Sequence, residues 1–200
     1  MRVYVASKNA GKIRELQALF APAGWELRTY EGYADPVEGE ASYADNAALK
    51  ARALAAQLSA AGITAPALGD DSGLEVTVLD GRPGVLSARY GGAEAPWAER
   101  RRMLLEEIAA SGRADRSARF VCALHLVAEE GREYAVFEAL PGEIAACDQG
   151  VGGFSYDPIF TYPPVGKTFG ELSDVEKNAV SHRALAARAL LRAWPRGSEA

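Results

Sequence analysis

Two adjacent acids, Asp70 and Asp71, have the residue type and spacing best suited to metal-dependent chemistry in this chain. They follow the apolar run Ala65–Leu68 and precede Ser72-Gly73, so we expect a strand that ends in two carboxylates and a turn at the rim of a sheet. Mg²⁺ usually takes one or two protein carboxylates and keeps its other positions for water and substrate phosphate. Because like charges side by side repel, we expect a cation between them, either a metal or Lys12. One aspartate would then hold the metal while the other accepts a proton from water; the alternative is a turn in which Asp and Ser only satisfy backbone donors.

The segment between the first expected strand and the first expected helix is suited to phosphate. A loop that leads into a helix N-terminus presents backbone N–H groups and the positive end of the helix dipole. The spacing of a P-loop is absent, and a solvated turn with exposed lysines is the alternative. The candidate phosphate ligands are Ser7, Lys8, Asn9, Ala10, Gly11 and Lys12.

An acidic loop, residues 37–40, precedes the second expected helix. It is either a solvated loop or the source of a second carboxylate that faces the metal. Glu38 or Glu40 would be that ligand.

The C-terminal part of the chain carries residues suited to a flat heterocycle. Aromatic side chains flanked by glycines can stack on a ring while the backbone comes close. A lysine, a histidine and an arginine add donors for a keto oxygen or a phosphate. Lys177 and His182 lie about 140° apart on an ideal helix, so both touch one ligand only if the first turn is distorted or the ligand crosses the helix start. The candidates are Phe154, Ser155, Tyr156, Asp157, Lys177, His182 and Arg183, and the alternative for His182 is a surface position on an amphipathic helix.

Composition limits the class of protein. The chain has 200 residues and a mass of 21.2 kDa, which suits one domain, with residues 195–200 expected to be a frayed tail. A net charge of −5 argues against binding a nucleic-acid backbone. No apolar run is long enough for a signal peptide or a membrane span, so we expect a cytoplasmic protein that does not bind membranes. Cys122 and His125 lie in an apolar strand pattern and are expected to be structural.

Hydrophobic periodicity predicts an α/β fold with a mixed sheet, because strands occur both alternating with helices and in a consecutive run. The expected strands are 3–6, 65–68, 74–79, 119–128, 133–139 and 143–146. Helices are expected to begin at Gly11, at Ala47 with Asp45 and Asn46 as caps, at Pro96, and at the capping box Ser173–Glu176, the last running towards Trp194.

Five motifs, in order and spacing, resemble the inosine/xanthosine triphosphate pyrophosphatase family, which hydrolyses non-standard purine nucleoside triphosphates. They are SKNAGKIREL, ADNAALKARA, DDSGLEVTVLDGRPGVLSARYGG, GFSYDPIF and EKNAVSHR, and the likeness covers Val3 to about Leu191. The resemblance implies an elongated mixed sheet flanked by helices, two lobes with the active-site cleft between them, and a homodimer. It also implies Mg²⁺-dependent hydrolysis of ITP, dITP and XTP to the monophosphate and pyrophosphate.

The resemblance assigns a role to each candidate residue. Asp71 would be the proton acceptor and a metal ligand with Glu38, Asp70 would support it, and Ser72 would touch substrate. The loop from Ser7 to Lys12 would hold the triphosphate. Phe154, Ser155, Tyr156, Asp157 and Lys177 would bind the nucleotide, with His182 and Arg183 near the base.

The chain departs from the family pattern in places. Lys8 and Ser155 stand where glycine is common, and the usual Glu-x-Gly reads Glu-Gly-Glu, which leaves Glu38 and Glu40 as alternatives. Two rival functions are a pyrophosphatase for another modified nucleotide class and a non-catalytic nucleotide sensor. The ranking of substrates and the residue that rejects GTP are not determined by the sequence.

Overall fold

The computed structural model describes residues 1–92 and 94–195. The strands are β1 Arg2–Ala6, β2 Glu26–Arg28, β3 Ala67–Val76, β4 Ser117–Val127, β5 Glu133–Ile144, β6 Phe160–Tyr162 and β7 Lys167–Thr168. The α-helices are α1 Ala10–Phe20, α2 Tyr43–Ala60, α3 Trp97–Ala110, α4 Asp174–Val180 and α5 His182–Ala193. Short 3₁₀ helices are Ala21–Ala23, Thr77–Leu79, Gly84–Leu86, Asp157–Ile159 and Phe169–Glu171.

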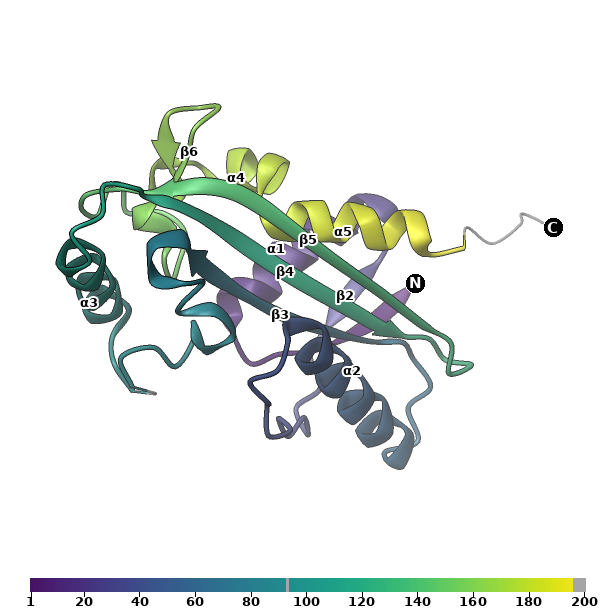
Figure 1. Ribbon diagram of the computed structural model, residues 1–200. Coiled ribbons are helices and arrows are strands. Elements are labelled where there is room, and N and C mark those ends of the chain that lie inside the picture. Colours follow the sequence, from purple (N-terminus) through teal and green to yellow (C-terminus); the bar gives the residue numbers. More distant parts are fainter. Residues whose placement is uncertain (93, 196–200) are drawn as a thin grey trace. The chain divides into compact units, whose positions relative to one another are not determined.

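Within the described residues the strands form one seven-stranded sheet in the order β2-β1-β3-β4-β5-β6-β7 (Figure 1). The pairs β1–β2 and β1–β3 are parallel, whereas β5–β6 and β6–β7 are antiparallel. The predicted mixed α/β sheet is therefore confirmed. In the described ranges no helix combines the length and apolar character needed to cross a bilayer.

The chain divides into two compact units, and β3 and β4 each run from one unit into the other. Unit 1 contains Met1–Asp71, Cys122–Glu138 and the chain from Arg183 onward; unit 2 contains Ser72–Val121 and Ala139–His182. The cleft between two lobes stays a prediction. The expected frayed tail falls almost entirely on residues 196–200, which lie outside the described part of the chain.

Unit 1 has helices on both faces of its strands. Val3, Val5 and Leu68 pack with apolar residues of α1 and α5, whereas Ala6 and Ala67 pack with Leu54 and Leu58 of α2. Successive strand residues point to opposite faces, which is why Val5 and Ala6 join different clusters. Figure 1 shows α2 on the side of these strands opposite α1 and α5.

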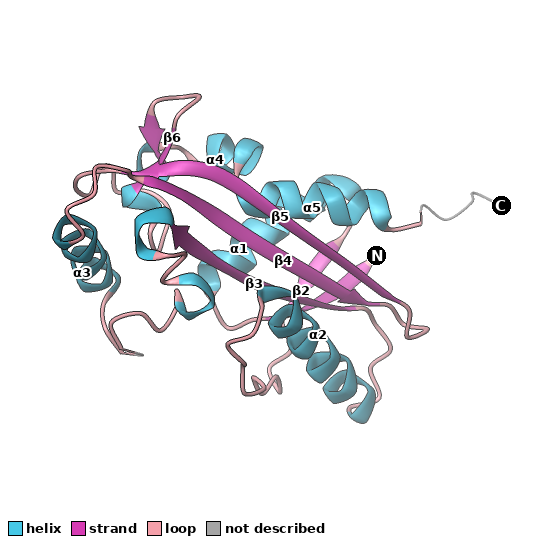
Figure 2. Cartoon of the chain, viewed as in Figure 1, coloured by secondary structure: helices cyan, strands magenta, loops and turns pink. Residues whose placement is uncertain are grey.

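Strand β3 is longer than expected and contains the aspartate pair. The sequence placed a turn at residues 70–73, but the strand continues from Ala67 to Val76, and Figure 2 shows it unbroken. The predicted turn was therefore wrong, and Gly69, just before it, allows close packing of α2 on the strand. A Cβ atom there would lie 2.0 Å from the carbonyl oxygen of Ala47 in α2, so only glycine lets the helix backbone approach the strand this closely.

The boundaries of the other elements agree with the sequence only in part. Asn9 caps α1, and the capping box at Ser173 and Glu176 is confirmed. Helix α2 begins at Tyr43 with Ser42 as its cap, so the predicted start at Ala47 was wrong. The expected strand 143–146 is the end of β5, not a separate strand.

The C-terminal helical region is interrupted, contrary to the prediction of one helix. Ser181 has φ −62° and ψ 158°, which ends α4 before α5 begins at His182. The extended ψ of this one residue removes the helical relation between Lys177 and His182. The calculated 140° separation therefore does not apply.

Candidate active site

Asp70 and Asp71 point to opposite faces of the sheet because they are neighbours within β3. Asp70 meets Lys12 of α1 and Arg183 of α5, whereas Asp71 meets Asn46 and Lys50 of α2. Each carboxylate has its own cations, so the expected repulsion between the two does not have to be relieved by one shared metal.

Asp70 is the centre of a buried ionic network in unit 1. Its Oδ1 accepts from Lys12 Nζ at 2.5 Å, its Oδ2 accepts from Arg183 Nε at 3.0 Å, and the Cys122 thiol lies 3.5 Å from Oδ2. Arg183 also pairs with Glu15. Burial favours a high pKa, but the charges of Lys12 and Arg183 outweigh it and hold the pKa of Asp70 well below its usual range. Asp70 is therefore a permanent anion that positions Lys12.

Asp71 has a different electrostatic environment. Its Oδ1 accepts from Lys50 Nζ at 3.0 Å and its Oδ2 accepts from the Asn46 amide at 3.1 Å. Burial raises the pKa of Asp71 above its ordinary value, and Lys50, Lys12 and Asn46 oppose this only in part. A carboxylate whose pKa is raised is a better proton acceptor than an ordinary one.

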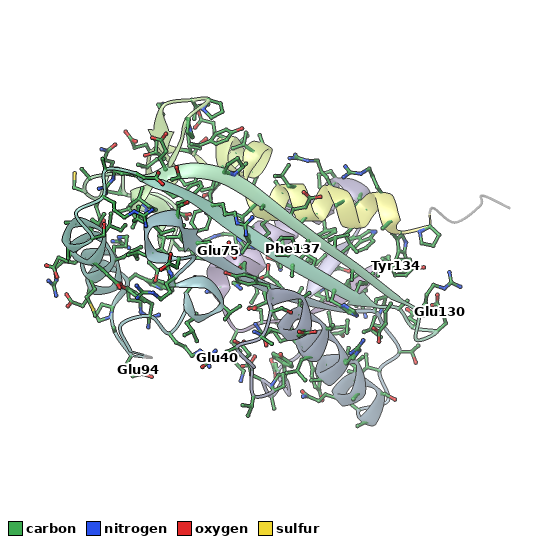
Figure 3. The ribbon with its side chains drawn as sticks, viewed as in Figure 1. Glu40, Glu75, Glu94, Glu130, Tyr134 and Phe137 are labelled. Atoms are coloured by element: carbon green, nitrogen blue, oxygen red, sulfur yellow. The ribbon has the colours of Figure 1, made fainter. Side chains whose placement is uncertain are left out.

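Glu38 joins the Asp71 side of the site. Its Oε1 lies 2.6 Å from Lys50 Nζ, so Glu38 and Asp71 converge on one ammonium group. Asn46 fixes the same loop, because its amide oxygen accepts from the N–H of Gly39 and its amide nitrogen donates to the Gly39 carbonyl. Glu40 is exposed on this loop, as Figure 3 shows, and the geometry favours Glu38 over it.

The donor set fits a divalent cation. Two carboxylates, Glu38 and Asp71, already direct oxygens at a cation, and Mg²⁺ binds through one or two protein carboxylates. No group of three or more His, Cys, Asp or Glu residues suited to a metal occurs in residues 1–92 and 94–195. A pair of carboxylates suits Mg²⁺, which keeps its other positions for water and substrate phosphate.

The phosphate candidates lie at the start of α1. The Asn9 side chain caps the helix by accepting from the Lys12 N–H at 3.1 Å, and Ser7 Oγ accepts from the Asn9 N–H at 3.2 Å. Ala10 and Gly11 form the first turn, whose N–H groups have no partner within a helix. Lys8 is exposed and its Nζ lies 3.0 Å from Asp35.

A second group of candidates lies in unit 2. Lys177 Nζ is 2.5 Å from Asp157 Oδ2 and 4.7 Å from the centre of the Phe154 ring. Asp157 Oδ2 also accepts from the Phe154 N–H at 2.6 Å. The aromatic ring, the lysine and the aspartate are thus held together in unit 2, and their role in binding a nucleotide stays a prediction.

Tyr156 and His182 complete this group and are both buried. The Tyr156 hydroxyl donates to the Ser87 carbonyl at 3.0 Å, and its burial raises its pKa. The His182 ring stacks on Phe120 with 4.6 Å between centroids. His182 is therefore not the surface residue of the alternative interpretation.

Two candidates differ from expectation, and two further residues were missed. Arg183 was placed near a base, but its buried guanidinium lies in unit 1 with Asp70 and Glu15. Ser72, expected in a turn, lies within β3. Asn46 and Lys50 were not recognised, although their i, i+4 spacing on a helix rich in alanine was a signal that both face one site.

The comparisons with known proteins cover nearly the whole chain and point to one family. The Ham1 family model matches residues 3–193. The dITP/XTP pyrophosphatase of Thermus thermophilus is 46% identical over 199 residues, covering 98% of this chain and 93% of that protein. The solved structure of a HAM1 protein from Coxiella burnetii has a TM-score of 0.83 and 36% identity, covering 96% of this chain and 98% of that one. A nucleoside-triphosphatase / dITP/XTP pyrophosphatase from Mycobacterium abscessus has a TM-score of 0.71 and 38% identity, covering 98% of each chain. The chain therefore belongs to the Ham1 family.

Proposed function

We propose that this chain hydrolyses non-standard purine nucleoside triphosphates, ITP, dITP and XTP, to the monophosphate and pyrophosphate. The observation that carries the proposal is Asp71, a buried carboxylate of raised pKa that Lys50 and Asn46 hold beside Glu38. Relatives named dITP/XTP pyrophosphatase with 46% and 45% identity support the substrate class. The reaction removes such nucleotides before they enter DNA or RNA.

In this mechanism Asp71 takes the proton of the water that attacks the α-phosphorus. Lys12, positioned by Asp70, and the first turn of α1 bind the phosphate oxygens and stabilise the charge that develops on the leaving pyrophosphate. Glu38 and Asp71 would hold Mg²⁺, which supplies further neutralisation of phosphate charge when bound. Asn46 holds the Asp71 carboxylate and the loop that carries Glu38 together, because it hydrogen-bonds to Asp71 and to Gly39.

The base is assigned to the unit 2 group. Phe154 offers a ring for stacking, and His182, Lys177 and the backbone N–H groups of residues 155 and 156 are donors for the 6-keto oxygen. A site built on such donors leaves them unpaired against an adenine amino group, and this discriminates by up to roughly 10⁴. The family resemblance supports a homodimer and a cytoplasmic location, which belong to this proposal.

The test is pyrophosphate release from dITP, XTP, dGTP, dATP and dUTP, each with Mg²⁺ and with EDTA. We expect fast release from dITP and XTP only, and only with Mg²⁺. Release from dUTP would favour a pyrimidine enzyme, whereas nucleotide binding without release would favour a sensor. The Asp115→Asn variant, which changes an exposed loop aspartate, is the matched control for changes at Asp71.

A further inference from the structure

The guanidinium of Arg101 on α3 contacts segment 154–157, to which the base is assigned. Arg101 Nε lies 3.0 Å and 2.9 Å from the two carboxylate oxygens of Asp148, and Nη2 lies 2.7 Å from Asp148 Oδ2. The remaining arm, Nη1, donates to the backbone carbonyl of Ser155 at 2.8 Å. Only 13% of the Arg101 side chain is exposed, so this contact is part of the folded unit and not a solvated surface charge.

Ser155 has a backbone conformation that needs such support. Its φ is +61°, in the left-handed region that side chains larger than glycine adopt at an energetic cost. Conformations of this kind persist where the surrounding structure holds them. A charged donor on the Ser155 carbonyl is a contact that would be lost if the peptide rotated.

The same face of α3 holds the next residue of the segment. Trp97 lies four residues before Arg101, and its ring packs edge-on against Tyr156 with 5.4 Å between centroids. Helix α3 therefore contacts the main-chain carbonyl of Ser155 and the aromatic ring of Tyr156. Phe154 is fixed separately, since its N–H donates to Asp157.

We propose that Arg101 is a positioning residue for base recognition, which it controls through the main chain of Ser155; this rests on the proposed function above. Arg101 contacts Asp148 and Ser155 within unit 2, so the proposal gives it a role in positioning the segment and no role in the chemical step. Its loss should weaken nucleotide binding and purine discrimination while chemistry at the α-phosphorus continues. This predicts a change in KM for dITP with little change in kcat.

The experiment compares the steady-state kinetics of R101A, R101K and D148N with those of R102A, using dITP, XTP, dGTP and dATP with Mg²⁺. Arg102 is the matched control, because its side chain is 54% exposed and forms ion pairs with Glu99 and Glu106 of the same helix. We expect R101A to raise the KM for dITP about tenfold, the size of one charge-assisted hydrogen bond, with kcat within about threefold of wild type. R101K should have a KM between those of wild type and R101A, because lysine keeps the charge but lacks the planar guanidinium fork. D148N should have a smaller effect, because the Ser155 contact remains.

A rescue variant separates positioning from general destabilisation. Glycine adopts positive φ without a side-chain penalty, so the KM of R101A/S155G should return most of the way to the wild-type value. Unchanged KM in R101A, or equal changes in R101A and R102A, would overturn the inference. If R101A does not fold, R101K is used in its place, and a KM of R101K equal to that of wild type overturns the proposal. Wild type without dITP turnover would contradict the proposed function itself, which is a distinguishable result.

Discussion

Lys50 is the residue whose removal tests the structure of the site most directly. Its side chain is 8% exposed, and its Nζ lies 3.0 Å from Asp71 and 2.6 Å from Glu38. Burial alone would lower the pKa of Lys50, but Asp71 and Glu38 raise it, so the group is charged at neutral pH. Lys50→Met keeps most of the side-chain volume and removes the charge.

The size of the effect follows from burial. Removing one partner of a buried ion pair typically costs about 3–5 kcal/mol, because the other charge remains without compensation. The lower end applies here, since 29% of the Glu38 side chain is exposed. For a chain of this length about 3 kcal/mol corresponds to a fall in Tm of roughly 6–12 °C. Without Lys50 the pKa of Asp71 rises further, so the pH below which turnover is lost should also rise.

The assay is thermal unfolding followed by circular dichroism without divalent ions, with pyrophosphate release measured in parallel from pH 5 to 9. Arg52→Met is the matched control, because Arg52 lies on the same helix with a side chain that is 60% exposed. Its exposed pair with Glu133 should contribute about 0.2–1 kcal/mol. The reasoning is refuted if Lys50→Met and Arg52→Met have the same Tm, or if Lys50→Met retains the wild-type pH profile.

Three further predictions concern the acid–base residue, the packing of β3 and a surface ion pair. Asp71→Asn should lower kcat by about 10²–10⁴ without changing Tm by more than a few degrees, and turnover above one tenth of wild type would remove Asp71 from the role of base. Gly69→Ala should destabilise the protein by about 1–3 kcal/mol or more, measured by urea unfolding, because its Cβ meets the α2 backbone; wild-type stability would contradict that packing. Hydrogen bonding to Arg52 lowers the pKa of Glu133 to about 2, so its contribution to stability is complete above the unfolded pKa of about 4.3 and is lost as pH falls towards 2. The stability difference between wild type and Glu133→Gln should therefore shrink from pH 6 to pH 2, and a constant difference would show that the charge of Glu133 is not involved.

Elements whose signals are local could be predicted from the sequence. The capping box at Ser173 and Glu176 requires only two residues three positions apart. The order of strands and helices was sufficient to predict a mixed sheet. The motifs around these elements also identified the family.

The tertiary structure decided what the local signals could not. Gly-Asp-Asp-Ser-Gly has the composition of a turn, but α2 packs on Gly69 and the chain stays extended through both aspartates. Extension sends Asp70 to Lys12 and Arg183, and Asp71 to Lys50, so neighbours in sequence acquire opposite shifts in pKa.

The same reason accounts for the residues that the sequence did not assign. Lys50 resembled an ordinary helix cation and Arg183 was assigned to the base, whereas the structure pairs them with carboxylates 21 and 113 positions away in the chain. Residue types and local spacing therefore determined the family, the kind of chemistry and most secondary structure. Only the packing of helices on the sheet determined which cation faces which carboxylate, because that pairing depends on burial and on contacts between distant segments.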